Sequence, residues 1–476
     1  MKKLLSLIAV TLAFSSVMFA QDTKKESNLK NNFKLYGFVR NYFAFDSRES
    51  VSGTGDLFYY LPKDVNMVNG EDLNATPSFT ALALTSRLGV DVTGYNIGNV
   101  HFGAKIEGDF YAGLSKSSAA NATDFFPGNT SVSGTAQARL RQAYATVTWK
   151  DLTLAGEQKA SVALKIGQAW HPMGADHPHI FSLEAGAPFG PFSRTPQVTM
   201  DANLGDNWVV SASALWQMQY NSQGPIGGSA IYMKYGMTPE FYAAVAYKEK
   251  GFLFRLGADL LSIKPRVLGT LDGAKVKVSD RKTSMLYYAY TQYSYKKFAL
   301  KAKTTFGESG EHLNLMSGYA KVGENADGSW NYASLRSSSS WLSMTYGKKW
   351  QGVLFLGYVK TLGFADPAAN NILVSSGDSS KQAEVYYCGN GFSNINQIYR
   401  INPQLIYNIG KLNVGIEYQW TSVQYGDYIK VKRDVVDADG NTKTVTDKYL
   451  NSNGLAKDNL HWVGNHRVNL MVKYNF

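Results

Sequence analysis

From residue 33 to its C-terminus, the chain alternates apolar and polar side chains with a period of two residues. A helix would mix the two kinds of side chain around its axis, whereas a β-strand puts them on opposite faces. The pattern therefore predicts strands that are apolar on one face and polar on the other. Residues 100–110 show it most clearly, with Val100, Phe102, Ala104, Ile106 and Phe110 on one face and His101, Lys105, Glu107 and Asp109 on the other.

Sixteen segments carry this alternation, and each is long enough for a tilted crossing of a bilayer, which takes about 9–11 residues. In the second segment, the apolar face is predicted to consist of Leu82, Leu84, Leu88, Val90 and Val92. The sixteen predicted strands are 33–46, 79–94, 99–113, 136–150, 161–170, 196–204, 207–220, 239–248, 251–264, 282–295, 297–307, 338–347, 350–362, 395–409, 411–425 and 461–476.

The connections between these strands alternate between short and long without exception. In an up-and-down barrel, alternate connections lie at the same end, so the short turns gather at one end and the long loops at the other. Outer-membrane barrels have this asymmetry, and a spanning sheet must close because lipid offers no hydrogen bonds to a free edge. The short connections centre on 96–98, 151–160, 205–206, 249–250, 296, 347–348 and 410, and the long ones span about 47–78, 114–135, 171–195, 221–238, 265–281, 308–337, 363–394 and 426–460.

The composition supports a barrel with one water-facing wall. Charged residues make up 18% of the 476 residues and aromatic residues 13%, whereas soluble domains contain about 25% charged residues. Mean hydropathy is nevertheless slightly negative, at -0.23. No segment after the N-terminus approaches the roughly 18 consecutive apolar residues of a membrane helix. A bundle of membrane-spanning helices is therefore excluded.

The N-terminus is typical of an export signal. Lys2 and Lys3 precede an apolar run from Leu4 to Phe14, which is too short to span a bilayer, and we expect cleavage after Ala20. An uncleaved membrane anchor is the alternative. The predicted division of the chain is a signal peptide at 1–20, a periplasmic tail at 21–32 and a barrel at 33–476.

Removal of the two signal lysines lowers the net charge from +11 to +9. The basic residues are spread along alternating strands and form no cluster, so nucleic acid is not expected as a partner. The only cysteine, Cys388, excludes an internal disulfide and is expected to be an unreactive thiol in a loop.

Four motifs stand out along the chain: Ile166-Gly167-Gln168-Ala169-Trp170-His171-Pro172, Gly186-Ala187-Pro188-Phe189, Pro191-Phe192-Ser193-Arg194-Thr195-Pro196-Gln197 and Arg400-Ile401-Asn402-Pro403-Gln404-Leu405. They resemble porins of Bacteroidota and the wider DcaP-like porin family. The resemblance implies a trimeric 16-stranded barrel whose third long loop folds into the lumen, and a preference for anionic solutes such as dicarboxylates. The last strand resembles the C-terminal signal that the barrel-assembly machinery reads, because its outward positions are Val468, Leu470, Val472, Tyr474 and Phe476.

The third long loop, 171–195, is dense in Pro, Gly and His, and its prolines limit its flexibility. We expect it to form the constriction of the lumen, and an ordinary external loop is the alternative. Four of its side chains have metal-ligand chemistry, namely His171, Asp176, His177 and His179. Because Pro172 and Pro178 interrupt any regular spacing, we predict no metal site and no cofactor here. These side chains are expected to line the pore or pack the loop.

Charged side chains on the polar strand faces are the candidate pore lining. A basic excess raises the local concentration of anions, and an opposed acidic patch orients dipolar solutes. Arg139 and Arg141 are the first choices because they lie two residues apart on one face. The alternative is that lumen charges neutralise one another in pairs. The candidate set is Arg139, Arg141, Arg40, Arg87, Arg194, Lys105, Glu107, Asp109 and Arg400.

The segment Asp437-Ala438-Asp439-Gly440-Asn441 has the composition of a calcium loop but fails its spacing. Aligning Gly440 with the invariant glycine puts Val435 and Thr446 at the first and last ligand positions. The segment instead predicts the turn of a hairpin in an external loop.

Together these features predict an all-β, transmembrane, antiparallel up-and-down barrel in the outer membrane. The predicted function is that of a porin, and not of an enzyme, through which small polar and chiefly anionic solutes diffuse passively. The expected partners are the lipid bilayer, lipopolysaccharide, the barrel-assembly machinery through Phe476, and further copies of the chain in a homotrimer. Two alternatives stay open: a surface or adhesion barrel with a closed lumen, and an outer-membrane enzyme, which would need a Ser/His or paired-acid constellation at the wall.

Overall fold

The computed structural model describes residues 29–53, 58–83, 86–116, 130–154, 158–180, 186–436 and 440–476. The predicted signal peptide and most of the predicted tail lie outside the described residues. Strand β1 begins at Leu29, four residues before the predicted start of the barrel. Within the described ranges, no helix is both long and apolar enough to cross a membrane.

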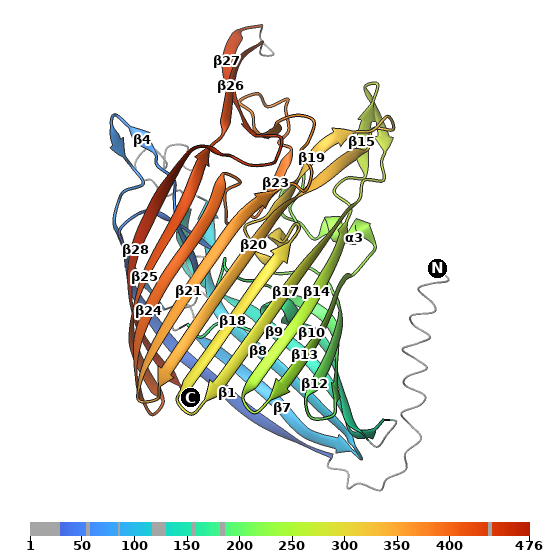
Figure 1. Cartoon of the computed structure of the whole chain (residues 1–476), viewed down its shortest axis with the longest axis vertical. Coiled ribbons are helices and arrows are strands. Elements are labelled where there is room, and N and C mark those ends of the chain that lie inside the picture. Colours follow the sequence, from blue (N-terminus) through green and yellow to red (C-terminus); the bar gives the residue numbers. More distant parts are fainter. Residues whose placement is uncertain are drawn as a thin grey trace.

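Sixteen antiparallel strands follow one another around a closed barrel, as predicted (Figure 1). The barrel closes where β1 pairs with the last strand, in a register that runs from Phe38 opposite Asn475 to Asp46 opposite Arg467. The wall strands are β1 (Leu29–Asp46), β6 (Ser78–Leu82) continued by β7 (Arg87–Ile97), β8 (Val100–Lys116), β9 (Thr130–Thr153), β10 (Lys159–Trp170), β11 (Arg194–Leu204), β12 (Trp208–Leu215), β13 (Glu240–Glu249), β14 (Phe252–Ile263), β17 (Lys282–Tyr295), β18 (Phe298–Gly307), β20 (Trp330–Gly347), β21 (Trp350–Gly363), β24 (Ile395–Ile409), β25 (Leu412–Asp427) and β28 (Asp458–Asn475).

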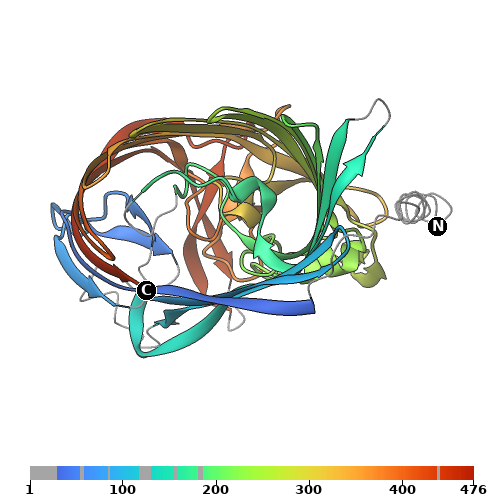
Figure 2. The ribbon, with the colours of Figure 1, turned by 90° about the horizontal axis from the view of Figure 1, so that it is seen from below.

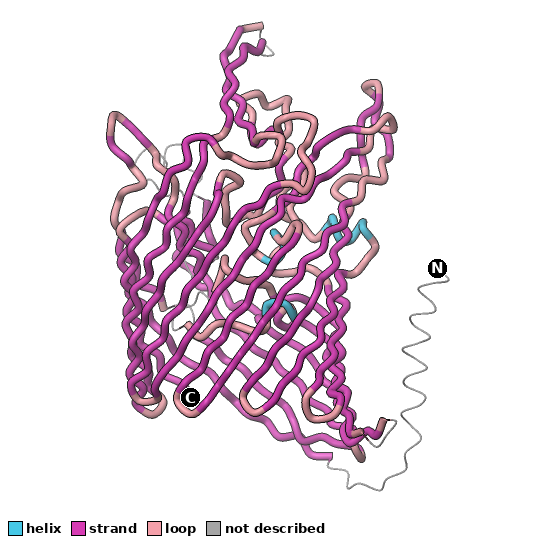
Figure 3. Tube along the Cα trace, in the orientation of Figure 1, coloured by secondary structure: helices cyan, strands magenta, loops and turns pink. Residues whose placement is uncertain are grey.

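Short turns lie at one end of the barrel and long loops at the other, which confirms the predicted asymmetry (Figure 3). The hairpin of β26 and β27 projects from the loop end and confirms the predicted hairpin, although 437–439 in its turn lie outside the described residues. The elements within the long loops are β2 (Ser50–Gly53), β3 (Phe58–Pro62), β4 (Met67–Val68), β5 (Glu71–Asp72), η1 (Pro172–Gly174), α3 (Ile231–Gly236), β15 (Leu268–Leu271), β16 (Ala274–Lys277), η2 (Glu311–Leu313), β19 (Gly318–Glu324), β22 (Ile372–Ser375), β23 (Val385–Tyr387), β26 (Ile429–Val436) and β27 (Thr442–Leu450).

The alternation along the wall strands puts apolar side chains outside and polar side chains inside. Val39 is 50% exposed on the outer surface, whereas its neighbour Arg40 is 7% exposed inside. Ile416 and Glu417 show the same contrast on the other side of the closure, with exposed fractions of 50% and 1%. An apolar outer wall with a polar interior suits a barrel that is surrounded by lipid and contains water.

The second wall strand differs from the prediction because it is interrupted. Strand β1 pairs Phe38 with Arg87 but Tyr42 with Leu82, so the register shifts by one residue between β7 and β6. A shift of one residue turns the following side chains to the other face. Leu82 therefore packs inside the barrel with Tyr42, whereas Leu88 is exposed outside. The prediction that Leu82 and Leu88 share a face is wrong, and Leu84 lies outside the described residues.

The interior of the barrel contains side chains from the loops as well as from the wall. Figure 2 shows loop segments crossing the ring of strands when the barrel is seen from its turn end. The largest apolar cluster joins the third loop and the loop after β18 to the wall, and its members include Phe189, Phe192, Leu313, Met316, Trp341, Phe355 and the buried thiol of Cys388.

The two faces of β12 provide a direct test of this arrangement. Ala212 is exposed on the outer face, and the adjacent Ser211 faces inward, where its hydroxyl donates to Asp201 at 2.5 Å. Because lipid cannot solvate an ammonium group, Ala212→Lys should lower the free energy of unfolding by about 2–4 kcal/mol if it lies near the bilayer midplane. Ser211→Lys at the same depth pairs with Asp201, and we expect a change below about 1 kcal/mol. Denaturant unfolding in lipid vesicles measures both values, and equal losses would contradict the assignment of the two faces.

Candidate functional site

The third long loop, here called L3 (residues 171–193), joins β10 to β11 and folds into the barrel, as predicted. It begins with the short helix η1, whose first turn is capped by His171, since the Nδ1 atom accepts a hydrogen bond from the Met173 amide at 3.2 Å. Met173 and Phe189 are completely buried. Both described ends of L3 thus have side chains that are packed in the interior.

Glycines allow L3 to lie directly on the inner wall. A Cβ atom at Gly190 would lie 2.8 Å from the indole Nε1 of Trp341 on β20, and one at Gly357 on β21 would lie 2.5 Å from the Phe189 ring. Phe189 also meets Phe355 edge-on, with 5.8 Å between the ring centroids. Any larger side chain at Gly190 or Gly357 would force the loop away from the wall.

Polar contacts with β14, β18 and β20 also hold L3 in place. They use backbone carbonyl groups of the loop as well as its side chains, so the path of the L3 backbone itself is held. The contacts are Lys303 to the Met173 carbonyl, Lys301 to the His177 carbonyl at 3.2 Å, Arg255 to Asp176, the His179 amide to Ser343 at 3.1 Å and the His179 ring to Thr345 at 2.8 Å.

These contacts separate the four L3 side chains that have metal-ligand chemistry. Asp176 pairs with Arg255, and the His177 ring meets Trp170 with 4.3 Å between centroids. His179 binds β20, and His171 lies against Glu240 of β13 at 2.9 Å. The structure therefore places His177 and His179 in loop packing, and it brings His171 into a different cluster.

The opposite part of the inner wall carries most of the predicted charged residues. Arg139 forms two parallel hydrogen bonds of 2.9 Å with Asp109. Arg141 bridges two acids, with contacts of 2.8 Å to Glu107 and 2.7 Å to Asp109. Such charge-assisted pairs fix the guanidinium groups in one orientation. Arg139 and Arg141, the first candidates from the sequence, therefore share one partner, Asp109.

Further cations lie beside these pairs, around the ring of Phe38. The guanidinium carbon of Arg40 lies 4.8 Å from the centroid of that ring, that of Arg87 5.1 Å, and the ammonium of Lys473 5.4 Å. Lys105 pairs with Asp91 at 2.9 Å. We call the set Arg40, Arg87, Lys105, Arg139, Arg141 and Lys473 the basic wall.

Salt bridges connect several members of the basic wall. Three carboxylates among the described residues, those of Asp91, Glu107 and Asp109, lie among its six cations. Glu107 contacts both Arg87 and Arg141, and Asp109 contacts both Arg139 and Arg141. These side chains therefore form a connected network of charges and not a set of separate pairs.

Two histidines show that L3 lies between the basic wall and the lysines of β18. Burial lowers the pKa of His177 to about 3, and the charges of Lys303 and Arg141 contribute in the same direction. Burial also lowers the pKa of His179, together with the charges of Lys301 and Lys473. The His177 ring is therefore neutral at pH 7 in the folded barrel. Stability that depends on this neutral ring is lost as the pH falls from the ordinary value of 6.5 toward 3.

No protein-family model and no curated protein matches this sequence. Solved structures do match. The outer membrane channel DcaP of Acinetobacter baumannii is 17% identical with a TM-score of 0.57, over 95% of this chain and 99% of that one. An anion-selective porin from Comamonas acidovorans is 9% identical with a TM-score of 0.49, over 94% and 100% of the two chains.

The chain has the fold of a 16-stranded porin.

Within this porin fold, two of the predicted pore-lining residues are buried and are not members of the basic wall. The guanidinium of Arg194 lies 4.7 Å from the Trp170 ring, which it shares with Arg141, and Arg194 is 2% exposed. Arg400 lies on β24 behind L3, where it donates to Thr421 at 2.7 Å and lies 5.0 Å from the Phe189 ring. Both arginines are packed between L3 and the wall.

Sequence reasoning missed three lysines of the site. Lys301 and Lys303 hold L3 through its carbonyl groups, and Lys473 completes the basic wall from the last strand. Each lysine lies at an inward position of a strand with clear alternation, so the sequence pattern already indicated that it faces the lumen. Which inward cations meet is set by the strand register around the barrel and by the path of L3, and neither can be read from local spacing.

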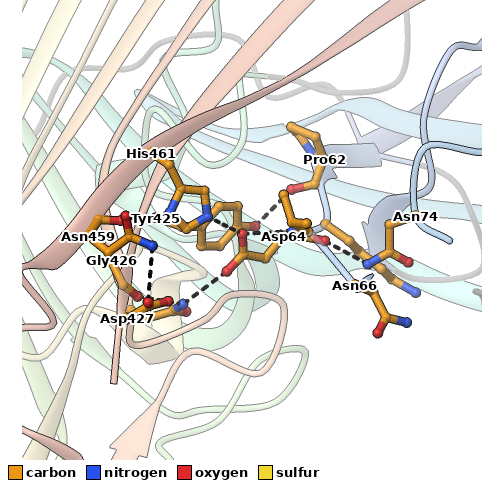
Figure 4. A network of polar contacts seen from close by, with 12 residues as sticks. Pro62, Asp64, Asn66, Asn74, Tyr425, Gly426, Asp427, Asn459 and His461 are labelled. Atoms are coloured by element: carbon orange, nitrogen blue, oxygen red, sulfur yellow. Dashed lines mark hydrogen bonds and ion pairs between the residues drawn. The ribbon is translucent and has the colours of Figure 1, made fainter. Parts of the chain in front are cut away.

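A second loop covers the lumen nearer the mouth of the porin fold. Asp64, in the loop between β1 and β6, accepts from His461 of β28 at 2.6 Å, and the hydroxyl of Tyr425 of β25 donates to the Pro62 carbonyl at 2.8 Å (Figure 4). This loop is thereby fixed across the closure of the barrel, and it adds to L3 in narrowing the interior.

Replacement of Gly190 tests whether L3 packs directly against Trp341 on the inner wall. Gly190→Ala places a methyl group against the buried Trp341 ring, and overpacking of this kind lowers stability by about 1–3 kcal/mol. Gly352→Ala, in the wall strand β21 and with no atom within 4 Å of its Cβ position, should change stability by less than about 0.5 kcal/mol. Thermal unfolding of the two folded barrels measures the difference, and equal stability would show that L3 does not rest on Trp341 as described.

Proposed function

We propose that this protein is an outer-membrane porin through which small polar solutes, above all anions, diffuse passively. The proposal is supported by three features described above: a closed barrel of sixteen strands, an apolar outside with a polar inside, and a loop anchored across the lumen. Sixteen strands enclose a lumen too wide for wall side chains alone to fill, so the loops set its width. Diffusion through such a lumen needs no catalytic group.

The basic wall is the observation that carries the preference for anions. Each positive charge changes the energy of a monovalent ion about 7 Å away in water by about 0.6 kcal/mol, which is roughly a threefold change in local concentration. Six cations gathered on one wall should therefore enrich anions in the constriction, and the carboxylates among them should weaken this effect. The DcaP-like resemblance adds dicarboxylates as a solute class that fits this charge.

We also propose a cellular setting for this barrel, which rests on the sequence features of the N-terminus and on the resemblance to Bacteroidota porins. The chain is exported by its signal peptide, residues 1–20, and is inserted into an outer membrane of the Bacteroidota type, where it contacts lipid and lipopolysaccharide. We propose that three copies associate, as the resemblance implies. Native mass measurement of the purified barrel tests this, and a stable monomer would remove the trimer from the proposal.

The charge preference is tested by reversal potentials across planar bilayers in a potassium chloride gradient. The wild-type barrel should give stepwise conductance with a preference for chloride. Arg139→Ser combined with Arg141→Ser removes two cations from the basic wall and should lower the chloride preference by several fold, whereas Glu107→Gln should raise it. No conductance would favour a barrel with a closed lumen, and a potassium preference in the wild type would contradict the role of the basic wall.

A matched control separates a local effect from a change in total charge. Lys430→Ser combined with Lys432→Ser removes the same two charges from exposed positions of the hairpin strand β26, and the selectivity should stay unchanged. The chloride preference should also decline between about 0.1 M and 1 M salt, because the screening length shortens from about 10 Å to 3 Å. Selectivity that does not depend on salt would indicate discrimination by size.

The terminal residue tests the proposed route of assembly. Phe476 is 44% exposed, and its amide donates to the Gly37 carbonyl of β1 at 3.1 Å. If assembly machinery reads this ring, Phe476→Ala should reduce the amount of folded barrel in the outer membrane while purified protein still folds in detergent. Phe45→Ala, which removes a ring of similar exposure (46%) from β1, is the control. Equal amounts of all three proteins in the membrane would contradict this role of Phe476.

A further inference from the structure

Four side chains with metal-ligand chemistry meet at a completely buried place near the loop end of the barrel. They are His171 at the start of L3, Glu240 at the start of β13, Asp259 on β14 and His312 in η2, and none is more than 2% exposed. His171, Glu240 and Asp259 each offer one ligand atom within 4.8 Å of the others. The Nε2 atom of His312 lies 3.1 Å from the Glu240 Oε1 atom. The β13–β14 hairpin and two loops that are distant from it in the sequence therefore converge on one point.

The hydrogen bonds of this cluster leave its carboxylates unsatisfied. Glu240 uses its Oε1 atom for both imidazoles, at 2.9 Å from His171 and 3.1 Å from His312. Its Oε2 atom and both carboxylate oxygens of Asp259 are buried and have no hydrogen-bond partner among the described residues. The Oδ1 atom of Asp259 lies 3.8 Å from the Nε2 atom of His171. A buried charge is ordinarily paired or bound to a metal, because its desolvation is otherwise too costly.

A divalent cation at this point would balance the cluster in charge and in geometry. Two carboxylates and two neutral imidazoles carry a charge of two negative units, which one divalent ion cancels. Zinc holds nitrogen and oxygen ligands at about 2.0–2.2 Å in a tetrahedron, so its ligand atoms are about 3.3–3.5 Å apart. Three of the separations, 2.9, 3.1 and 3.8 Å, differ from that spacing by about half an ångström, and the ligand atoms of His171, Glu240 and Asp259 all lie within 4.8 Å of one another.

The two imidazoles differ in how readily they present Nε2 to a metal. The Nδ1 atom of His312 is buried without a hydrogen-bond partner, so it can hold the ring proton and leave Nε2 free. The Nδ1 atom of His171 instead accepts from the Met173 amide at 3.2 Å. A metal on Nε2 moves the His171 proton to Nδ1, and this hydrogen bond is then lost. His171 is consequently the ligand that must adjust on binding.

We propose that His171, Glu240, Asp259 and His312 bind one divalent transition-metal ion, for which Zn²⁺ is the best match. The mixed nitrogen and oxygen ligands favour such an ion over Ca²⁺ or Mg²⁺, which prefer oxygen ligands alone. The ion joins the root of L3 to β13, β14 and η2. Its role is structural, since it fixes the start of the loop that crosses the lumen, and the proposal does not depend on which solutes pass.

The full-length barrel, folded in detergent, provides the test. Protein purified with ZnCl2 present and then dialysed should contain one zinc ion per chain by elemental analysis. Asp259→Asn and His312→Gln should lose it, whereas His179→Gln, which alters a histidine of the same loop outside the cluster, should keep it. Removal of the ion by a chelator should lower the melting temperature, and ZnCl2 but not CaCl2 or MgCl2 should restore it.

The wild-type protein decides the outcome even if a variant fails to fold. X-ray absorption at the zinc edge should then show nitrogen and oxygen ligands that include two imidazoles. A zinc-free wild type whose melting temperature does not respond to ZnCl2 would overturn the proposal. Retention of the same zinc content by folded Asp259→Asn and His312→Gln would overturn it as well, because the ion would then lie elsewhere.

Discussion

The need to satisfy every backbone hydrogen bond within hydrocarbon governs this structure. An open sheet would leave N–H and C=O groups unpaired along two edges, so the first and last wall strands must pair with each other. The pairing of β1 with β28 meets this requirement. A ring of sixteen strands, however, encloses more space than its own inward side chains can fill. The loops that enter the barrel occupy part of this remaining space.

L3 and the basic wall are best understood as two halves of one arrangement. Lysines of β18 hold the loop by its carbonyl groups, and glycines bring its backbone close to Trp341. The loop is thereby held against one side of the interior, and the charged residues of β1, β7, β8 and β9 lie on the other. Salt bridges to Glu107 and Asp109 orient the guanidinium groups of Arg139 and Arg141. Packing against β18 and β20 therefore sets the position of L3, and the basic wall supplies the charge that faces it.

Much of the architecture could be predicted from the sequence because the wall obeys a local rule. Each strand places one face in lipid, so alternation identifies strands such as 100–110, and the lengths of the connections then order them into a barrel. The rule fails where backbone pairing shifts, as between β7 and β6, because a one-residue shift leaves no mark on composition.

The candidate site could be predicted only in part, for a related reason. Arg139, Arg141, Glu107 and Asp109 lie on neighbouring strands, so their alternation was enough to group them. Arg400 shares that alternation but is covered by Phe189 of L3. The meeting of His171 with Glu240 and His312 depends on where two loops run inside the barrel. Such contacts belong to the tertiary fold and have no counterpart in spacing along the chain.

The loop between β1 and β6 has a consequence for how this barrel can move. It leaves the first strand, crosses the closure and is fixed to β25 and β28 through Pro62 and Asp64. The two ends of the sheet are thus joined by the backbone hydrogen bonds between β1 and β28 and also by the hydrogen bonds of this loop. Separating the first strand from the last would require both sets of hydrogen bonds to break together. A solute in the lumen therefore has no lateral path into the bilayer, and it can move only along the barrel axis.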